Sequence, residues 1–194
     1  MQACIERHIR RHIEVFEEFF LPLAPQVGEC AALLCACFRA GGKVLVMGNG
    51  GSAADAQHMA AELVGRFMLN RAALPAIALT TDTSILTAVA NDFGYAEVFK
   101  RQIEALANPG DVVIGISTSG NSPNVVAAFE LAQSRGCKIV ALSGRDGGEM
   151  ALYADLNLTV AVDETPRIQE VHLSMIHILC DLVEQELFAK QERS

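Results

Sequence analysis

The sequence predicts an α/β protein, built as a three-layer α/β/α sandwich around a five-stranded parallel sheet and preceded by an N-terminal helical arm. From about residue 42 onward, short continuous apolar runs alternate with helical patterns. Strands of this kind are typical of a parallel sheet that is covered by helices on both faces. Glycine- and serine-rich turns follow two of the apolar runs, and ligands of such sheets bind at the carboxyl ends of strands.

The first 41 residues predict the helical arm. Residues 2–20 carry charged side chains on one face and apolar side chains at helical spacing on the other, namely Ile5, Ile9, Ile13, Phe16 and Phe20. Pro22 and Pro25 should break this helix. A second helix over about 26–40 is apolar almost all round and is ended by Gly41-Gly42. An arm that precedes the first strand in this way is suited to packing against another subunit.

Residues 42–194 predict the α/β core with a long C-terminal helix. The apolar runs indicate strands near 43–47, 75–80, 111–116, 137–142 and 156–162. Helices are expected near 52–68, 83–91, 95–107, 122–135 and 166–190. No repeat or linker divides the sequence, so residues 1–194 are expected to form a single domain.

The composition argues against several classes of function. Of the 194 residues, 51% are hydrophobic and 20% are charged, as in a globular protein. The net charge of −8 argues against broad binding to nucleic acid or to a membrane surface, because both need basic patches. The longest apolar run, Cys30–Phe38, is too short to span a bilayer. The six cysteines match neither a zinc ribbon nor a redox pair, and the N-terminus lacks a signal-peptide pattern, so a cytoplasmic location is expected.

The two polar turns are suited to binding a phosphate. They are Gly48–Ser52, after the first strand, and Ser117–Ser122, after the third. The start of a helix offers free N–H groups and a partial positive charge, and the hydroxyl groups add donors. Two alternatives stay open: ordinary turns with serine caps, and a dinucleotide site, because the first turn also fits a G-x-G-x-x-A fingerprint with Asp82 as a ribose ligand.

Two further pairs are candidates for a metal site. His58 and Glu62 are four residues apart, so they share one helix face, and their side chains are of the types that bind zinc. Gln169 and His177 lie on the last predicted helix, where eight residues span about 12 Å. Both could reach one ion only if the helix begins or bends near Gln169, or if one ligand comes from another subunit; we favour a site at a subunit interface. The ordinary alternatives are a surface His-Glu pair and a core histidine.

Several ordered motifs together resemble the phosphoheptose isomerases, which are sugar-isomerase (SIS) domain enzymes. The motifs are GNGGSAADAQHMAAELVGRF at 48–67, NDFGY at 91–95, GISTSGNSPNV at 115–125, DGG at 146–148 and RIQEVHLSMIHIL at 167–179. The resemblance implies the flavodoxin-like SIS fold and the conversion of sedoheptulose 7-phosphate to D-glycero-D-manno-heptose 7-phosphate, the first step of ADP-heptose synthesis for the lipopolysaccharide core. It also implies a cytoplasmic homotetramer with one zinc ion per subunit.

By position, the resemblance also assigns roles to residues. It makes His58, Glu62, Gln169 and His177 the zinc ligands, with Glu62 as general base and His177 as general acid. The implied substrate contacts are Asn49, Gly50, Gly51, Glu62, Asn91, Asp92, Ser117, Thr118, Ser119, Ser122 and Gln169, with the serine loop holding the phosphate. One departure is that Ala53-Ala54 stands where some members have His-Cys; neither position has an assigned role.

A second class of protein shares these features. The segments 73–82 and 180–182 also resemble a tetrameric SIS-domain protein that binds the bacterial replication initiator and is not an enzyme. A binding protein need not keep Glu62 and His177, whereas an isomerase must. Both residues are present, which favours the enzyme. A sugar-phosphate-sensing regulator is disfavoured, because no basic helix flanks the domain.

Overall fold

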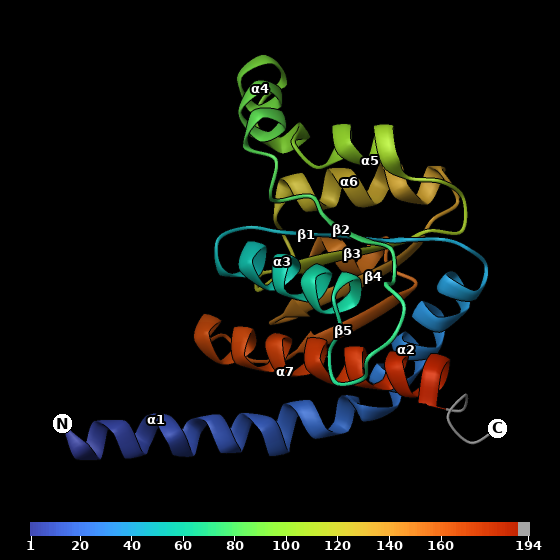
Figure 1. Cartoon of the computed structure of the whole chain (residues 1–194). Coiled ribbons are helices and arrows are strands. Elements are labelled where there is room, and N and C mark those ends of the chain that lie inside the picture. Colours follow the sequence, from blue (N-terminus) through green and yellow to red (C-terminus); the bar gives the residue numbers. More distant parts are fainter. Residues whose placement is uncertain (190–194) are drawn as a thin grey trace.

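The computed structural model describes residues 1–189 (Figure 1). Five parallel strands form one sheet in the order β2-β1-β3-β4-β5. The strands are β1 (Val44–Gly48), β2 (Ala76–Ala78), β3 (Val112–Ser117), β4 (Lys138–Gly144) and β5 (Leu156–Val160). All five fall on the predicted apolar runs, so the parallel sheet is confirmed.

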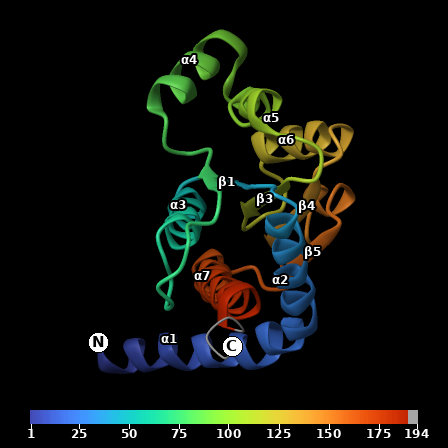
Figure 2. The same ribbon diagram turned by 45° about the vertical axis from the view of Figure 1, so that its right-hand side comes forward.

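Helices cover both faces of this sheet (Figures 1 and 2). One face is packed by α2 (Ala24–Arg39), α3 (Gly51–Val64) and α7 (Thr165–Glu184), and the other by α5 (Lys100–Leu106) and α6 (Pro123–Ser134). Because side chains alternate along a strand, Val44 and Val46 join the first core while Leu45 and Met47 join the second. The three-layer sandwich is therefore confirmed.

The N-terminal arm is helical throughout. α1 (Gln2–Val15) continues through a π-helical turn (Phe16–Phe20) and a 3-10 turn (Leu21–Leu23) into α2. The chain changes direction at this point (Figures 1 and 2). The predicted break at the two prolines is therefore a bend rather than a loop, because both stand in the first turn of their element, where a missing N–H costs little.

This continuous segment, Gln2–Arg39, is long and apolar enough to cross a membrane by length and composition alone, with a mean hydropathy of 1.5 in its most apolar window. The prediction rests on the run Cys30–Phe38 alone, which is too short to span a bilayer, whereas the helical segment in the structure is longer. Length and composition are weak indications, since the core helix of a soluble protein passes the same test. Here the apolar side chains of α2 pack into the core against the sheet and α7, as at Cys30 and Leu34.

Several helix ends differ from the prediction. α3 ends at Val64, not near residue 68, and the stretch predicted as one helix over 95–107 is a 3-10 turn (Tyr95–Glu97) followed by α5. α4 (Thr83–Phe93) buries none of its residues and projects from the body in Figure 1. α7 is followed by a π-helical turn, Gln185–Ala189. The predicted helix end at 190 and the predicted domain end at 194 lie outside the described residues.

Candidate active site

The two polar turns follow neighbouring strands of the sheet. β1 ends at Gly48 and β3 ends at Ser117, and Gly48 pairs with Ile116 in the parallel register. The helix after β1 packs on one face of the sheet and the helix after β3 packs on the other. Such a switch between adjacent parallel strands opens a crevice at their carboxyl ends, where ligands bind.

The first turn requires its glycines. Gly50 has a φ of +57°, which favours glycine. A Cβ atom on Gly48 would lie 2.6 Å from the Ser52 carbonyl oxygen, and one on Gly51 would lie 2.4 Å from Nε2 of Gln169. The turn thus packs tightly, and the N-terminus of α3 offers N–H groups beside the amide of Gln169.

The second turn gathers hydroxyl groups. The Oγ atom of Ser117 lies 2.8 Å from that of Ser122 and 3.4 Å from that of Ser119. Gly120 has a φ of +67°, and a Cβ atom there would lie 2.1 Å from the Gly147 carbonyl oxygen, so the DGG segment at 146–148 packs directly against the turn. Thr118 is half-buried in the same turn. Hydroxyl donors and the start of α6 meet here, as a phosphate site requires.

An amide pair joins the two turns. Asn49 and Asn124 each donate from Nδ2 to the Oδ1 atom of the other at 2.9 Å, and the hydroxyl of Tyr95 donates to Oδ1 of Asn49 at 3.0 Å. The Asn124 side chain lies in the buried first turn of α6. Sequence reasoning missed Asn124 and Tyr95, because neither belongs to the first loop and only the fold brings them to it.

Asn91 and Asp92 lie apart from these contacts. Both are exposed on α4, and Asn91 donates to the carboxylate of Asp92 at 2.8 Å. α4 buries none of its residues, and Tyr95, two residues after its end, contacts the first turn through Asn49. The predicted contact of Asn91 and Asp92 with substrate stays a prediction.

The candidate acid and base both lie close to His58, between α3 and α7. Nε2 of His58 lies 2.8 Å from Nε2 of His177 and 3.6 Å from a carboxylate oxygen of Glu62. The ring of Phe67 stacks on the imidazole of His177 at a centroid distance of 5.6 Å. Two residues 119 positions apart in sequence are thus in direct contact beside a carboxylate. One histidine must donate and the other accept in this pair.

Gln169 lies elsewhere on the same helix. α7 is unbroken from Thr165 to Glu184, and Gln169 contacts Gly51 at the start of α3 while His177 contacts His58 two turns further along. The helix therefore neither begins nor is interrupted between the two residues. Within residues 1–189, no three His, Cys, Asp or Glu side chains converge closely enough to hold a metal ion.

Comparison with known proteins agrees with this geometry. The family model described as SIS domain matches residues 8–144. The chain is 59% identical over 186 residues to the phosphoheptose isomerase of Geobacter sp. (strain M21), covering 96% of this chain and 97% of that protein. It is 58% identical over 188 residues to the phosphoheptose isomerase of Geobacter metallireducens, covering 97% and 100%.

This chain belongs to the phosphoheptose isomerase family.

The fold of this chain is also that of a solved relative. The structure of phosphoheptose isomerase from Neisseria gonorrhoeae superposes with a TM-score of 0.90 at 45% sequence identity, covering 95% of this chain and 98% of that one. The predicted SIS fold with its long N-terminal helix is confirmed. The protein is therefore an isomerase that acts on phosphosugars. Asp82, the ribose ligand of the dinucleotide alternative, instead caps α4 by accepting the N–H of Ile85 at 2.9 Å.

Two more titratable groups lie on α7 and α3. His172 is fully buried, and its Nε2 atom contacts the Ser143 carbonyl oxygen at 2.9 Å. Burial lowers the pKa of this imidazole from 6.5 to about 4, so His172 is a neutral core histidine. Asp55 lies one turn before His58, and its Oδ2 atom is buried with no hydrogen-bond partner among residues 1–189. Burial raises the pKa of that carboxyl, against the opposing influence of His58.

Proposed function

We propose that this protein converts D-sedoheptulose 7-phosphate to D-glycero-D-manno-heptose 7-phosphate by moving a proton between neighbouring carbons through an enediol(ate). The observation that supports this most strongly is that His58 of α3 lies close to both His177 of α7 and Glu62 of α3. A ketose-aldose exchange needs a carboxylate base and an acid that serves the sugar oxygens, and each such group contributes roughly 10²–10⁴-fold in rate.

Glu62 is proposed as the base that takes a proton from C1 of the ketose, exchanges it with solvent, and delivers a proton to C2. His177 is proposed as the acid that donates a proton to the carbonyl oxygen at C2 and accepts the proton that leaves the C1 hydroxyl, since imidazole titrates near neutrality. The phosphate is assigned to the serine turn, where Ser117, Ser119 and Ser122 gather their hydroxyl groups. The first turn holds the sugar, with Asn49 oriented by its amide pair.

We also propose one zinc ion per subunit. The residues fit such an ion in type, because two imidazole nitrogens lie beside a carboxylate oxygen, and these are zinc ligands. Binding of the ion would draw the three side chains closer together than they lie in this structure. When bound, zinc would polarise a substrate oxygen or orient its ligands. His58, Glu62 and His177 are proposed as ligands from one subunit. Gln169 is the proposed fourth ligand, and its place beside Gly51, two turns away, favours its donation from a neighbouring subunit.

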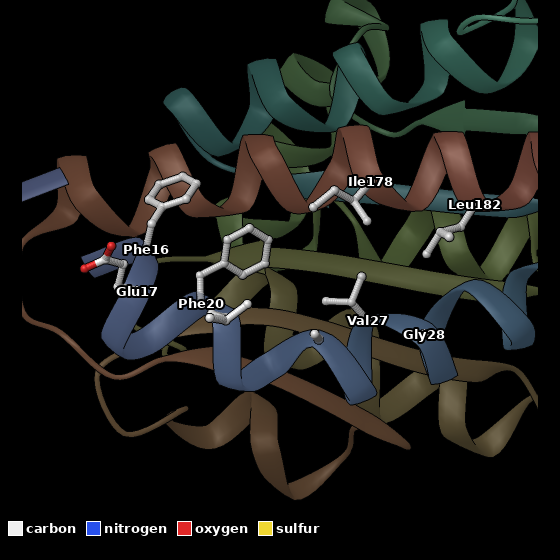
Figure 3. Close-up of a pocket in the computed structure, with 9 residues that line it drawn as sticks. Phe16, Glu17, Phe20, Val27, Gly28, Ile178 and Leu182 are labelled. Atoms are coloured by element: carbon white, nitrogen blue, oxygen red, sulfur yellow. The ribbon is translucent and has the colours of Figure 1, made fainter. Parts of the chain in front are cut away.

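The exposed apolar surface supports a homotetramer with the active site near a subunit interface. A groove of about 630 Å³ lies between the arm and α7 (Figure 3), lined by Phe16, Glu17, Phe20, Leu21, Ala24, Val27, Gly28, Ile178 and Leu182. Next to it, α1 leaves Ile5, Ile9 and Ile13 about half exposed. An apolar groove and an unpaired apolar helix face on one chain are the two halves of a self-complementary interface.

The proposed reaction supplies the first intermediate of ADP-heptose synthesis for the lipopolysaccharide core. That role fits a protein without a nucleic-acid or membrane partner, in keeping with the net charge of −8. The proposed location is the cytoplasm.

A panel of ketose phosphates tests the proposed function. Purified protein should turn over sedoheptulose 7-phosphate faster than shorter ketose phosphates, with the aldose identified by NMR. Removal of metal with a chelator should lower turnover, and zinc should restore it. Absence of turnover with every sugar, in protein that is folded and zinc-loaded, would reject the proposal and favour the SIS-domain protein that binds the replication initiator.

A further inference from the structure

A buried ion pair lies next to the acid and base without belonging to them. The side chains of Arg71 and Glu184 are each 1% exposed, and Nε of Arg71 donates to Oε1 of Glu184 at 2.8 Å. Glu184 is the last residue of α7. Arg71 lies in the segment that follows α3. The pair therefore connects α7 to the chain leaving α3.

The Glu184 carboxylate holds this segment by its backbone. It accepts the N–H groups of three successive residues at 2.7–2.8 Å, those of Phe67, Met68 and Leu69. These residues form no helix or strand, so their N–H groups are not bonded to carbonyl oxygens of a helix or a sheet. The carboxylate thus replaces the hydrogen bonds that regular structure would otherwise supply.

Arg71 holds the end of α3 in the same way. Its guanidinium donates to the carbonyl oxygens of Glu62 at 2.8 Å and of Leu63 at 2.9 Å, and also to that of Ala72. The last carbonyls of a helix have no partner within the helix. Arg71 satisfies two of them, including the one that belongs to the proposed base.

The segment held by Glu184 carries Phe67, whose ring stacks on His177 at an interplanar angle of 29°. His177 and Glu184 are seven residues apart, two turns along one face of α7. The same cluster of contacts therefore reaches the backbone of Glu62 directly and the imidazole of His177 through Phe67.

We propose that the Arg71–Glu184 pair is a positioning device for the reaction: it fixes Phe67 against the His177 imidazole and holds the Glu62 turn of α3 in register with α7. This inference rests on the proposed function. Stability alone does not explain the pair, because replacing a buried ion pair by apolar residues is often neutral or stabilising. Directional bonds to two catalytic elements are what an apolar contact could not supply.

Two variants test the proposal with a readout that does not depend on activity. Phe67→Leu keeps an apolar side chain and removes the ring, and Glu184→Gln removes the charge from the pair. The imidazole Cε1–H resonance of His177, observed in histidine-labelled protein, reports the ring current of Phe67. We expect both variants to shift this resonance. We expect each to lower kcat by about 10- to 100-fold, as small misplacements of catalytic groups do, and to change KM by less than about 3-fold because the phosphate turns are untouched.

Asp111→Asn is the matched control. Asp111 also has a buried carboxylate that pairs with a cation, Lys43, and accepts backbone N–H groups from Lys43 and Asn108, but it lies at the amino end of β3. We expect this variant to lower stability and leave the His177 resonance and kcat unchanged. Wild-type resonance and kcat in Phe67→Leu would overturn the proposal even if Glu184→Gln fails to fold. An equal loss of kcat in Asp111→Asn would also overturn it. If the wild-type protein has no isomerase turnover, the proposed function fails. The shift of the His177 resonance in the variants would still test whether the Arg71–Glu184 pair positions Phe67 against His177.

Discussion

At the scale of single residues, His172 is a fully buried histidine to which the proposed mechanism assigns no role. Burial lowers its pKa from 6.5 to about 4, partly opposed by its hydrogen bond to Ser143. Between these two pH values the unfolded chain binds a proton at this residue and the folded protein does not. Stability from His172 is therefore present above pH 6.5 and is lost as the pH falls to about 4.

We predict that this one residue removes about 3 kcal/mol from the free energy of unfolding between pH 6.5 and pH 4. His172→Gln keeps an N–H donor for Ser143 and does not titrate, so its unfolding free energy should fall less steeply over that range. Urea unfolding at a series of pH values measures this difference. His8→Gln, at an exposed position on α1, is the control. An equal slope in His172→Gln and the wild-type protein would contradict the assignment.

The residues of the site divide into those that the sequence could predict and those that it could not. Motif spacing predicted His58, Glu62 and His177, because each carries a chemically demanding side chain at a fixed place in a recognisable pattern. Phe67, Asn124 and the Arg71–Glu184 pair were missed. Their roles depend on contacts between segments up to 117 positions apart, and no local pattern marks such contacts.

At the scale of elements, strands were easier to predict than helix ends. The buried strands of a parallel sheet are apolar at every position, which a sequence displays directly. The end of α3 depends instead on Gly65 and on the bonds that Arg71 makes to the last turn. The bend between α1 and α2 was predicted from Pro22 and Pro25, but not its helical form. That form follows because proline fits the first turn of a new helix.

The relation between Gln169 and His177 also belongs to this scale. The rise of an α-helix predicted that the two side chains could not reach one point from a straight helix. In the structure the two side chains lie against different turns of α3: Gln169 is next to Gly51, and His177 is next to His58. The sharing of the proposed metal site between subunits stays a prediction.

At the scale of the whole molecule, we predict that the isoleucine face of α1 holds the oligomer together. Ile9→Glu places a charge in the middle of the exposed face formed with Ile5 and Ile13, and it should dissociate the protein into smaller species. Arg10→Gln changes the net charge by the same amount at the exposed neighbouring position and should leave the assembly intact. Light scattering coupled to size-exclusion chromatography measures both. An intact tetramer in Ile9→Glu, or a monomeric wild-type protein, would contradict the proposed interface.

The central proposal at this scale is that a carboxylate on α3 and an imidazole on α7 act on the same sugar. The most direct test is isomerisation in D₂O by the wild-type protein and by Glu62→Gln, with Glu130→Gln on the exposed face of α6 as control. We predict that the wild-type protein and the control place deuterium at C2 of the aldose product, and that Glu62→Gln loses both turnover and deuterium incorporation by at least about 10²-fold. Wild-type rates of incorporation in folded Glu62→Gln would contradict the account.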